Sequence, residues 1–461
     1  MKRYQYSTIA LCVLLATGCV ARSELPEQQL DVPAQWQNGQ SQPQEQAISR
    51  WWTSFGDPQL DGWIDQVLAS NSDLALATLT LRQARLEAGL ATSDTYPDVS
   101  GTVSADRSKP LDGGDSSKSY QASLSVSYEL DLWGKLSAAK DEAMWTALAT
   151  QQEREATAQS LVATTAQLYW QIGYLNQRVE LSNNDINDAQ ETLALTESQY
   201  RHGSVTRLNV LEAQRTLAGL EATHRDYLQQ RTEAVNAFAI LFDQPPQDLA
   251  SRIPALPDYA VPAVEAGVPA DVLSRRPDVK QALFELKSTL AAKDYSDTNY
   301  FPSLTLTGAL GGSSTELRKL LSDPIGSLGA DLTMPFLNWN EMQLNRDIAQ
   351  VKYESAIITY RKTLYAAFQD VDNALSAKEN YAFQAEKLQK QYDAAAEAAR
   401  IYQSQYEYGA IEITTLLDAQ ENERSAKASL LENRYNQLVN MATVYQSLGV
   451  RILFRNNSFF R

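Results

Sequence analysis

The sequence predicts a mixed α and β membrane protein made of two similar repeats, each with one β-hairpin and long helices. Three observations predict this fold class. First, the stretch Gln405–Gln420 resembles Gln199–Gln214, with Tyr, Gly, Leu, Ala and Gln in register at a constant offset of 206 residues. Second, apolar and polar residues alternate in each half of the chain, as in strands with one apolar face. Third, a long proline-free stretch of helix-forming residues follows each alternating region.

The composition fits a large folded chain without a catalytic centre. The chain has 461 residues, 44% apolar and 21% charged, which is typical of globular rather than disordered proteins. Its net charge of −16 argues against nucleic acid as a partner, because phosphate binding needs a basic face. The chain has only two histidines, His202 and His224, and two cysteines. Metal binding and nucleophilic catalysis are therefore not expected. We therefore predict no enzyme activity, no metal and no bound cofactor.

The first residues are typical of a bacterial targeting signal. Lys2 and Arg3 precede an apolar run, Ile9–Leu15, that is too short to span a bilayer as a helix. The segment Leu15–Cys19 resembles a lipobox, with Ala16 where Leu is more usual, and predicts Cys19 as the lipidated first mature residue, carrying an acyl chain such as palmitate. Ordinary signal cleavage at another position is the alternative. By resemblance to other lipoproteins, Val20 after the cysteine allows sorting to the outer membrane.

A polar tether and the first helices follow. Residues 24–50 are rich in Gln and Pro and fit an extended tether. Asp57 and Pro58 supply an N-cap side chain and a proline at the first helical position. The helical spacing of apolar residues that begins here is expected to continue until Tyr96-Pro97 stops it.

Four segments alternate with period two. The clearest is 119–130, where apolar residues from Tyr120 to Leu130 alternate with Gln, Ser and Glu. The predicted strands are about 98–107, 119–130, 303–310 and 326–336. Each pair is separated by a loop rich in turn-forming residues, so each half of the chain offers one hairpin.

Four strands cannot close a barrel, and an open sheet edge cannot face lipid. Strands of about ten residues flanked by aromatic residues are nevertheless typical of outer-membrane proteins. Closure must then come from other copies of the chain, and three copies would give twelve strands. The alternative from these strands alone is a soluble antiparallel sheet that covers a helical core.

The helices that follow each hairpin are long. Residues 133–202 contain no proline, and these 70 residues would extend roughly 105 Å as one helix. Gly203 and Gly409 lie where each helix is expected to end in a left-handed conformation. Each repeat therefore contains a helical hairpin with a tight turn, at 203–206 and at 409–412.

The predicted organisation has six parts. They are a lipoprotein signal peptide (1–18), an N-terminal tether (19–56), a first repeat (57–243, with its helical hairpin at 133–243), a Pro-rich linker (244–268), a second repeat (269–449, with its helical hairpin at 338–449) and a C-terminal tail (450–461).

Several motifs, taken in order, resemble those of a known family. They are Asp57–Leu60, Asp131–Gly134, Ser274–Val279 and Tyr300–Leu304. With the duplication, they make the chain similar to the TolC/OprM family of outer-membrane efflux channels, in its NodT-like lipoprotein branch, over essentially the whole mature chain. From the residues alone, Arg275 and Arg276 in the third motif are expected to form ion pairs that fix a short helix.

The resemblance implies a homotrimer with a twelve-stranded transmembrane β-barrel in the outer membrane and a long periplasmic α-helical barrel. It also implies two partners, a periplasmic adaptor (membrane fusion) protein and an inner-membrane transporter of the RND or MFS type. The tips that contact the adaptor would be Gly203, Ser204, Val205, Gly409, Ala410 and Ile411. Many family members have Val before each tip glycine, whereas this chain has His202 and Tyr408.

The resemblance further implies a periplasmic gate at Asp418, with Thr414 and Thr415 nearby. Some relatives have a second Asp at the position of Thr415, and many have a basic residue at that of Ile411, so fewer polar links would hold this gate closed. Without the resemblance, Asp418 would be read as a solvated residue on a helix surface.

The implied function is passive. The channel would be the exit duct of a tripartite efflux pump, for drugs or other small molecules delivered by the inner-membrane partner. Two alternatives stay open, the outer-membrane duct of a polypeptide (type I) secretion system and a structural coiled-coil lipoprotein without a pore. The lipobox and the motif around Arg276 favour small-molecule efflux.

Overall fold

The structure, a computed structural model, describes residues 23–25, 31–38, 49–259, 261, 262, 269, 275–450 and 452. The predicted signal peptide, Cys19 and most of the C-terminal tail lie outside these residues. The chain divides into two compact units. Unit 1 comprises Met1–Leu30, Leu79–Gln152 and Lys280–Thr363, and unit 2 comprises Asp31–Thr78, Glu153–Val279 and Leu364–Arg461. Both units therefore contain residues from both sequence repeats.

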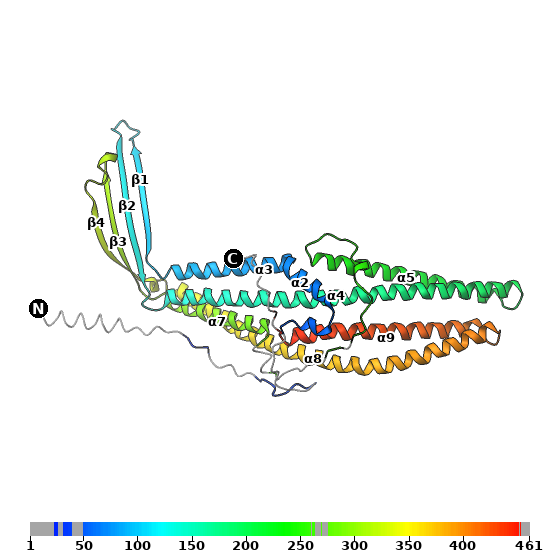
Figure 1. Cartoon of the computed structure of the whole chain (residues 1–461). Helices are drawn as coiled ribbons and strands as arrows, with labels where there is room; N and C mark the ends of the chain where they lie inside the picture. The colour runs from blue at the N-terminus through cyan, green and yellow to red at the C-terminus, as the bar shows by residue number, and fades with distance from the viewer. Residues whose placement is uncertain are drawn as a thin grey trace. The chain divides into compact units, whose positions relative to one another are not determined.

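Unit 1 contains one antiparallel sheet of four strands in the order β1-β2-β3-β4 (Figure 1). The strands are β1 (Asp98–Ser108), β2 (Ser117–Leu130), β3 (Ser303–Ser314) and β4 (Ile325–Thr333). The predicted two hairpins with four strands are confirmed. The register places Val126 opposite Val99, and Leu124 opposite Leu310. Because paired residues point to the same side, the alternating apolar residues of all four strands form one face and the polar residues the other.

Strand ends differ from the expected ones at three places. Strand β3 continues to Ser314, four residues beyond the predicted end, because it pairs with β2 as far as Tyr120. The first hairpin pairs as far as Ser108 and Ser117, so Ser117 and Lys118 belong to a strand and not to the predicted loop. Strand β4 ends at Thr333, three residues before the predicted end, and a short 3-10 helix η4 (Pro335–Leu337) follows. Proline explains this end, because Pro335 has no N–H to donate to a neighbouring strand.

The helices are α2 (Pro58–Ser70), α3 (Ser72–Ser93), α4 (Lys135–Arg201), α5 (Arg207–Ile240), α7 (Pro277–Thr298), α8 (Trp339–Glu407) and α9 (Ile413–Ser447). Further 3-10 turns are η1 (Trp51–Phe55), η2 (Ala250–Arg252) and η3 (Leu317–Lys319). In unit 1, α7 and α8 pack through Leu286, Leu290 and Tyr353, and Leu25 of the N-terminal segment packs against them.

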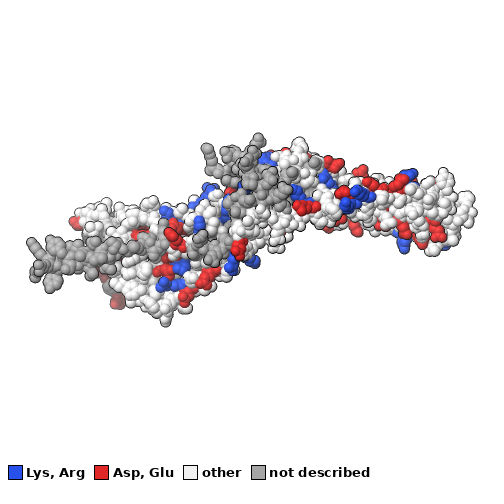
Figure 2. Space-filling view, turned by 90° about the horizontal axis from the view of Figure 1, so that it is seen from below, with Lys and Arg blue, Asp and Glu red and all other residues white. Residues whose placement is uncertain are grey.

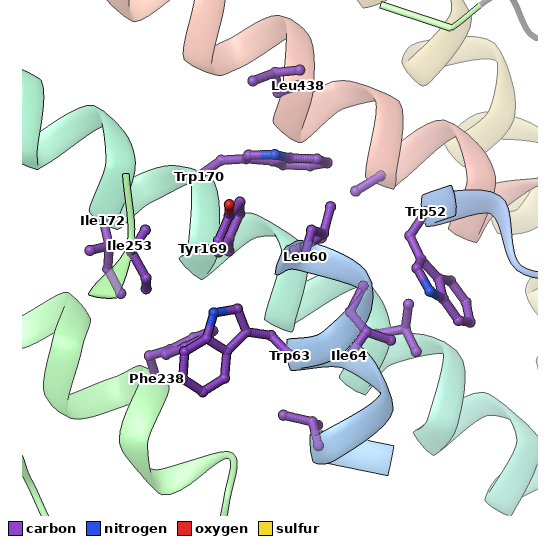
Figure 3. Close-up of a cluster of buried hydrophobic side chains, with 14 of the residues drawn as sticks. Trp52, Leu60, Trp63, Ile64, Tyr169, Trp170, Ile172, Phe238, Ile253 and Leu438 are labelled. Carbon is purple, nitrogen blue, oxygen red and sulfur yellow. The ribbon is translucent and has the colours of Figure 1, made fainter. Parts of the chain in front are cut away.

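Unit 2 has a large aromatic core, shown in Figure 3. Trp52, Trp170 and Phe238 are fully buried there, and they come from η1, α4 and α5. The start of α2 is fixed against this core by Asp57. One carboxylate oxygen accepts the N–H groups of Gln59 and Leu60, and the other accepts the Tyr169 hydroxyl at 2.9 Å. Burial of so many large apolar side chains is the main stabilising contribution to this unit.

The first helical region is broken, contrary to the expectation of one helical pattern up to Tyr96. Helix α2 ends at Ser70 and α3 begins at Ser72. Between them lies Asn71, in an extended conformation. Its side-chain oxygen accepts the Leu74 N–H at 3.0 Å, and its amide donates to the Leu241 carbonyl at 2.9 Å. Asn71 therefore starts a new helix and ties it to the end of α5.

The second repeat contains the equivalent of this joint. Arg276, 205 residues after Asn71, donates to the carbonyl of Ser447, 206 residues after Leu241, at 3.1 Å. Arg276 also forms ion pairs with Asp278 at 2.7 Å and Asp370 at 3.0 Å. The expected structural role of Arg276 is thus confirmed. The duplication holds at the level of single hydrogen bonds.

Candidate functional site

The helical hairpins of unit 2 end in two turns of the same geometry (Figure 1). At the first turn, Gly203 has φ +76, its N–H donates to the Tyr200 carbonyl, and the Ser204 N–H donates to the Gln199 carbonyl at 2.9 Å. At the second turn, Gly409 has φ +71 and makes the equivalent pair of hydrogen bonds. This is the Schellman arrangement, which needs a left-handed residue that glycine adopts without strain.

The tip residues lie at the surface. Gly203, Ser204, Gly409 and Ala410 are exposed, and Val205 and Ile411 are half-buried. On the face seen in Figure 2, few charged side chains lie at the hairpin tips, and acidic and basic groups are intermixed along the helices. Among the turn residues 203–206 and 409–412, only Glu412 carries a formal charge. A low density of charge is typical of the central part of a protein–protein contact.

A small apolar core joins the two hairpins just behind the turns. Its centre is Tyr406, which is 2% exposed and packs with Ile413 and Leu416. The Tyr406 hydroxyl lies 2.9 Å from the Thr196 hydroxyl, and it donates to the Gln199 side-chain oxygen at 2.9 Å. Burial raises the pKa of Tyr406, so the phenol stays protonated and able to donate.

The predicted gate residues share one exposed helix face. Thr414, Thr415 and Asp418 are exposed, whereas Leu416 and Leu417 between them are buried. Asp418 lines a cavity of about 550 Å³ between α4, α5 and α9. The same cavity is lined by three arginines, Arg178, Arg215 and Arg424. The carboxylate of Asp418 is therefore available to solvent or to a neighbouring molecule.

A group of carboxylates that was not predicted from the sequence lies between the hairpins. Asp185 of α4 and Glu423 of α9 line a cavity of about 670 Å³ together with Asp188, Arg424 and Lys427. Burial raises the pKa of the Asp185 carboxyl, and the positive charge of Arg424 partly opposes this effect. Burial also raises the pKa of Glu423, with Lys427 opposing. No local motif marks these residues, because they come together only when α4 and α9 pack.

The polar face of the sheet in unit 1 is lined by small hydroxyl side chains and by carboxylates. Paired serines such as Ser100 and Ser125 lie 2.7 Å apart, oxygen to oxygen. By the register, this face also carries four acidic residues, Asp98, Asp106, Glu129 and Asp331. Such a surface is suited to water, whereas the opposite, apolar face is suited to lipid.

The N-terminal segment is held in unit 1 close to the predicted lipid site. Ser23 lies four residues after Cys19. Its N–H donates to one Asp294 oxygen at 2.9 Å, and its hydroxyl donates to the other at 2.5 Å. Asp294 is 8% exposed, whereas Ser23 lies at the surface. Cys19 itself stays a prediction.

Among the described helices, none has the length and the apolar character needed to cross a membrane. An antiparallel sheet with one apolar and one polar face is typical of outer-membrane channel proteins. The family model for outer membrane efflux proteins matches residues 63–241 and 268–450. The chain belongs to this family, as the resemblance implied, and its place is the outer membrane.

Individual relatives match along nearly the whole length. The pyoverdine export outer membrane protein OpmQ of Pseudomonas aeruginosa is 29% identical over 467 residues, covering 97% of each chain. The toluene efflux pump outer membrane protein TtgC of Pseudomonas putida is 29% identical over 461 residues, covering 96% of this chain and 94% of that protein. The open state of the MtrE outer membrane channel of Neisseria gonorrhoeae is 28% identical with a TM-score of 0.83, covering 94% and 98%.

Proposed function

We propose that three copies of this chain form the outer-membrane duct of a tripartite efflux pump, and that the chain has no catalytic activity of its own. One observation carries the proposal. The sheet has an apolar and a polar face, and among the described residues the outer edges of β1 and β4 have no partner strand. Unpaired backbone groups are not tolerated in lipid, so the edges must pair with those of other copies. Closure would place the polar face around a water-filled lumen.

The unequal exposure of two equivalent tyrosines supports the same assembly. Tyr406 is buried against Gln199 within the chain, whereas its repeat equivalent Tyr200 is 42% exposed. The matching partner for Tyr200 would be Gln405, the repeat equivalent of Gln199, on another copy. Ile401, one turn before Gln405, is also 42% exposed. Each hairpin would then contact two others in a closed ring, one within its chain and one in the next copy.

The ring would place Asp418 and its equivalents in the other copies around one axis. Carboxylates held together at a narrow passage attract cations, so the passage would be acidic and would concentrate cations. Thr414 and Thr415 share the exposed face and would line the same constriction. Solute would then diffuse outward passively when a partner opens this end, because the chain itself supplies no energy source.

The tip turns would contact a periplasmic adaptor protein, which links the duct to an inner-membrane transporter. Their exposed position, low density of charge and hydrogen-bonded backbone support this role. Replacing Gly409 by Trp should weaken cross-linking to the adaptor and leave the trimer intact. Unchanged cross-linking and drug resistance would place the adaptor contact elsewhere.

Cys19 would carry the lipid anchor. The two hydrogen bonds from Ser23 to Asp294 support this role, since they would hold the lipidated end against the unit that contains the sheet. Cys19→Ser should remove the lipid mass while trimers persist, because the sheet already supplies lipid-facing area. Loss of all protein from the outer membrane would instead mean that the lipid is required for sorting.

Chemical cross-linking tests the assembly with an internal control. Treating a Tyr200→Cys/Gln405→Cys variant with a short bis-maleimide should produce covalent dimers and trimers in a denaturing gel. The equivalent variant Tyr406→Cys/Gln199→Cys should cross-link only within the chain and stay at monomer mass. If the first variant also stays at monomer mass while its control becomes cross-linked, the proposed ring is wrong. Transport of small solutes but not of polypeptides through the assembled duct would separate efflux from polypeptide secretion.

A further inference from the structure

Two basic residues lie directly opposite each other at the outer end of the first β-hairpin. The register pairs Arg107 of β1 with Lys118 of β2, and both side chains are exposed. Within the part of the chain that the structure describes, neither forms an ion pair. Like charges directly opposite in an antiparallel pair destabilise it. The hairpin thus keeps an unfavourable pair that an external anion would stabilise.

The alternation of the strands places this pair on the apolar face. Arg107 lies two and four residues beyond Ala105 and Val103 on the same side of β1, and Lys118 lies two residues before Tyr120 on that side of β2. Tyr120 is opposite Ala105, between the two cations and the aliphatic part of the face. Along this face, aliphatic residues are followed by an aromatic ring and then by the two cations. Side chains follow the same order from the hydrocarbon region to the headgroups at a membrane–water interface.

The dimensions place the pair at headgroup level. From Leu130 to Tyr120 the apolar side of β2 extends roughly 33 Å along the strand. Tilted as in a membrane barrel, this length covers about 25 Å of bilayer, the height of the apolar band in such proteins. Lys118 lies two residues further, roughly 7 Å beyond the band along the strand. The 109–116 loop is at the strand ends opposite those that lead to α3 and α4. With the helices on the periplasmic side, the pair faces the outer leaflet.

We propose that Arg107 and Lys118 form a binding site for the phosphate group of an outer-leaflet lipid, a phosphorylated glycolipid of the lipid A type. The inference rests on the proposed membrane insertion of the sheet. A guanidinium matches two phosphate oxygens in a bidentate contact, and an ammonium adds a compact second charge. Three copies would hold three such sites around the duct, one at each first hairpin.

The second hairpin offers a matched control. Its loop carries Arg318 and Lys319 near η3, and both are already paired with Glu316, at 2.9 and 3.1 Å. The single carboxylate of Glu316 therefore offsets one of their two positive charges within the chain. The first loop also carries Asp112 and Asp115, which form no ion pair with Arg107 or Lys118 in the described structure.

Native mass spectrometry of the detergent-solubilised full-length protein tests the site. Wild type, R107Q/K118Q and R318Q/K319Q are each incubated with bisphosphorylated lipid A and, separately, with chemically dephosphorylated lipid A. We expect R107Q/K118Q to retain about tenfold less bisphosphorylated lipid through loss of two charge-assisted contacts, and R318Q/K319Q to match wild type. The dephosphorylated lipid should bind all three proteins equally weakly.

Equal retention by R107Q/K118Q and wild type would overturn the inference, and so would equal binding of the two lipids by wild type. The midpoint of thermal unfolding without lipid should not fall in R107Q/K118Q, since the change removes a repulsion. Oligomeric state and bilayer conductance are measured on the same samples. A conducting trimer with unchanged lipid retention defeats only this inference, whereas absence of trimer or conductance defeats the proposed function.

Discussion

Replacing Gly449 by Ala should be much more destabilising than the same change at the hairpin tips. Gly449, Gly203 and Gly409 all have left-handed backbones, with φ of +68, +76 and +71. A Cβ at either tip glycine would meet nothing within 4 Å. At Gly449 it would lie 2.8 Å from both the Cα and the backbone N of Arg276. The three positions therefore share one backbone strain but differ in the space around them.

The backbone strain and the steric clash make separate contributions to the loss of stability. An L-residue in the left-handed conformation costs about 1–2 kcal/mol, and this cost applies at all three positions. The clash adds about 1–3 kcal/mol at Gly449, because it involves backbone atoms that cannot rotate away. Arg276 is itself fixed by Asp278, Asp370 and the Ser447 carbonyl, so relaxation would disturb that network. We expect a total of about 2–5 kcal/mol at Gly449 and about 1–2 kcal/mol at the tips.

Thermal unfolding in detergent, followed by far-ultraviolet circular dichroism, measures the difference. Gly449→Ala should lower the unfolding midpoint clearly more than Gly203→Ala or Gly409→Ala. Amide hydrogen exchange should locate the weakening at the end of α9, beside Arg276. Equal midpoints for the three variants would show that the close contact between Gly449 and Arg276 contributes nothing to stability.

Three further predictions concern the hairpin pair. Tyr406→Phe removes hydrogen bonds to two partners and should cost about 1–2 kcal/mol, seen as faster hydrogen exchange at the turns, whereas unchanged exchange would contradict the role of the hydroxyl. The pKa of Asp185 is raised in the folded protein, so the ionised carboxylate lowers the free energy of unfolding at neutral pH. This destabilisation disappears as pH falls toward about 4, where the carboxyl becomes protonated. Asp185→Asn should therefore raise stability at neutral pH and flatten its pH dependence relative to wild type, and a loss of stability at neutral pH would show that the sign is wrong. Asp418→Ala should weaken block by multivalent cations added on the tip side and raise conductance, and recordings identical to wild type would remove Asp418 from the gate.

Much of the fold could be predicted because its signals are local. Strict alternation from Tyr120 to Leu130 specifies a strand with two unlike faces, and no distant residue is needed to read it. Gly203 and Gly409 marked the turns because a left-handed backbone strongly favours glycine. The repeat offset then linked the two halves, and the backbone hydrogen bonds of the two turns recur at that offset.

Other features depend on contacts between distant helices, which no local sequence pattern indicates. Asn71 breaks a helical pattern because its amide reaches the Leu241 carbonyl, 170 residues away. Tyr200 and Tyr406 have similar neighbours in sequence, yet one is exposed and the other buried, since only the second meets another hairpin in the same chain. Asp185 and Glu423 likewise come together only when α4 packs with α9.

The most direct test of the account is single-channel recording of the purified chain in a planar bilayer, with its oligomeric state fixed by native mass spectrometry of the same preparation. We expect a trimer that conducts ions in steps of uniform size. A stably folded monomer, or a trimer that inserts but never conducts, would contradict it.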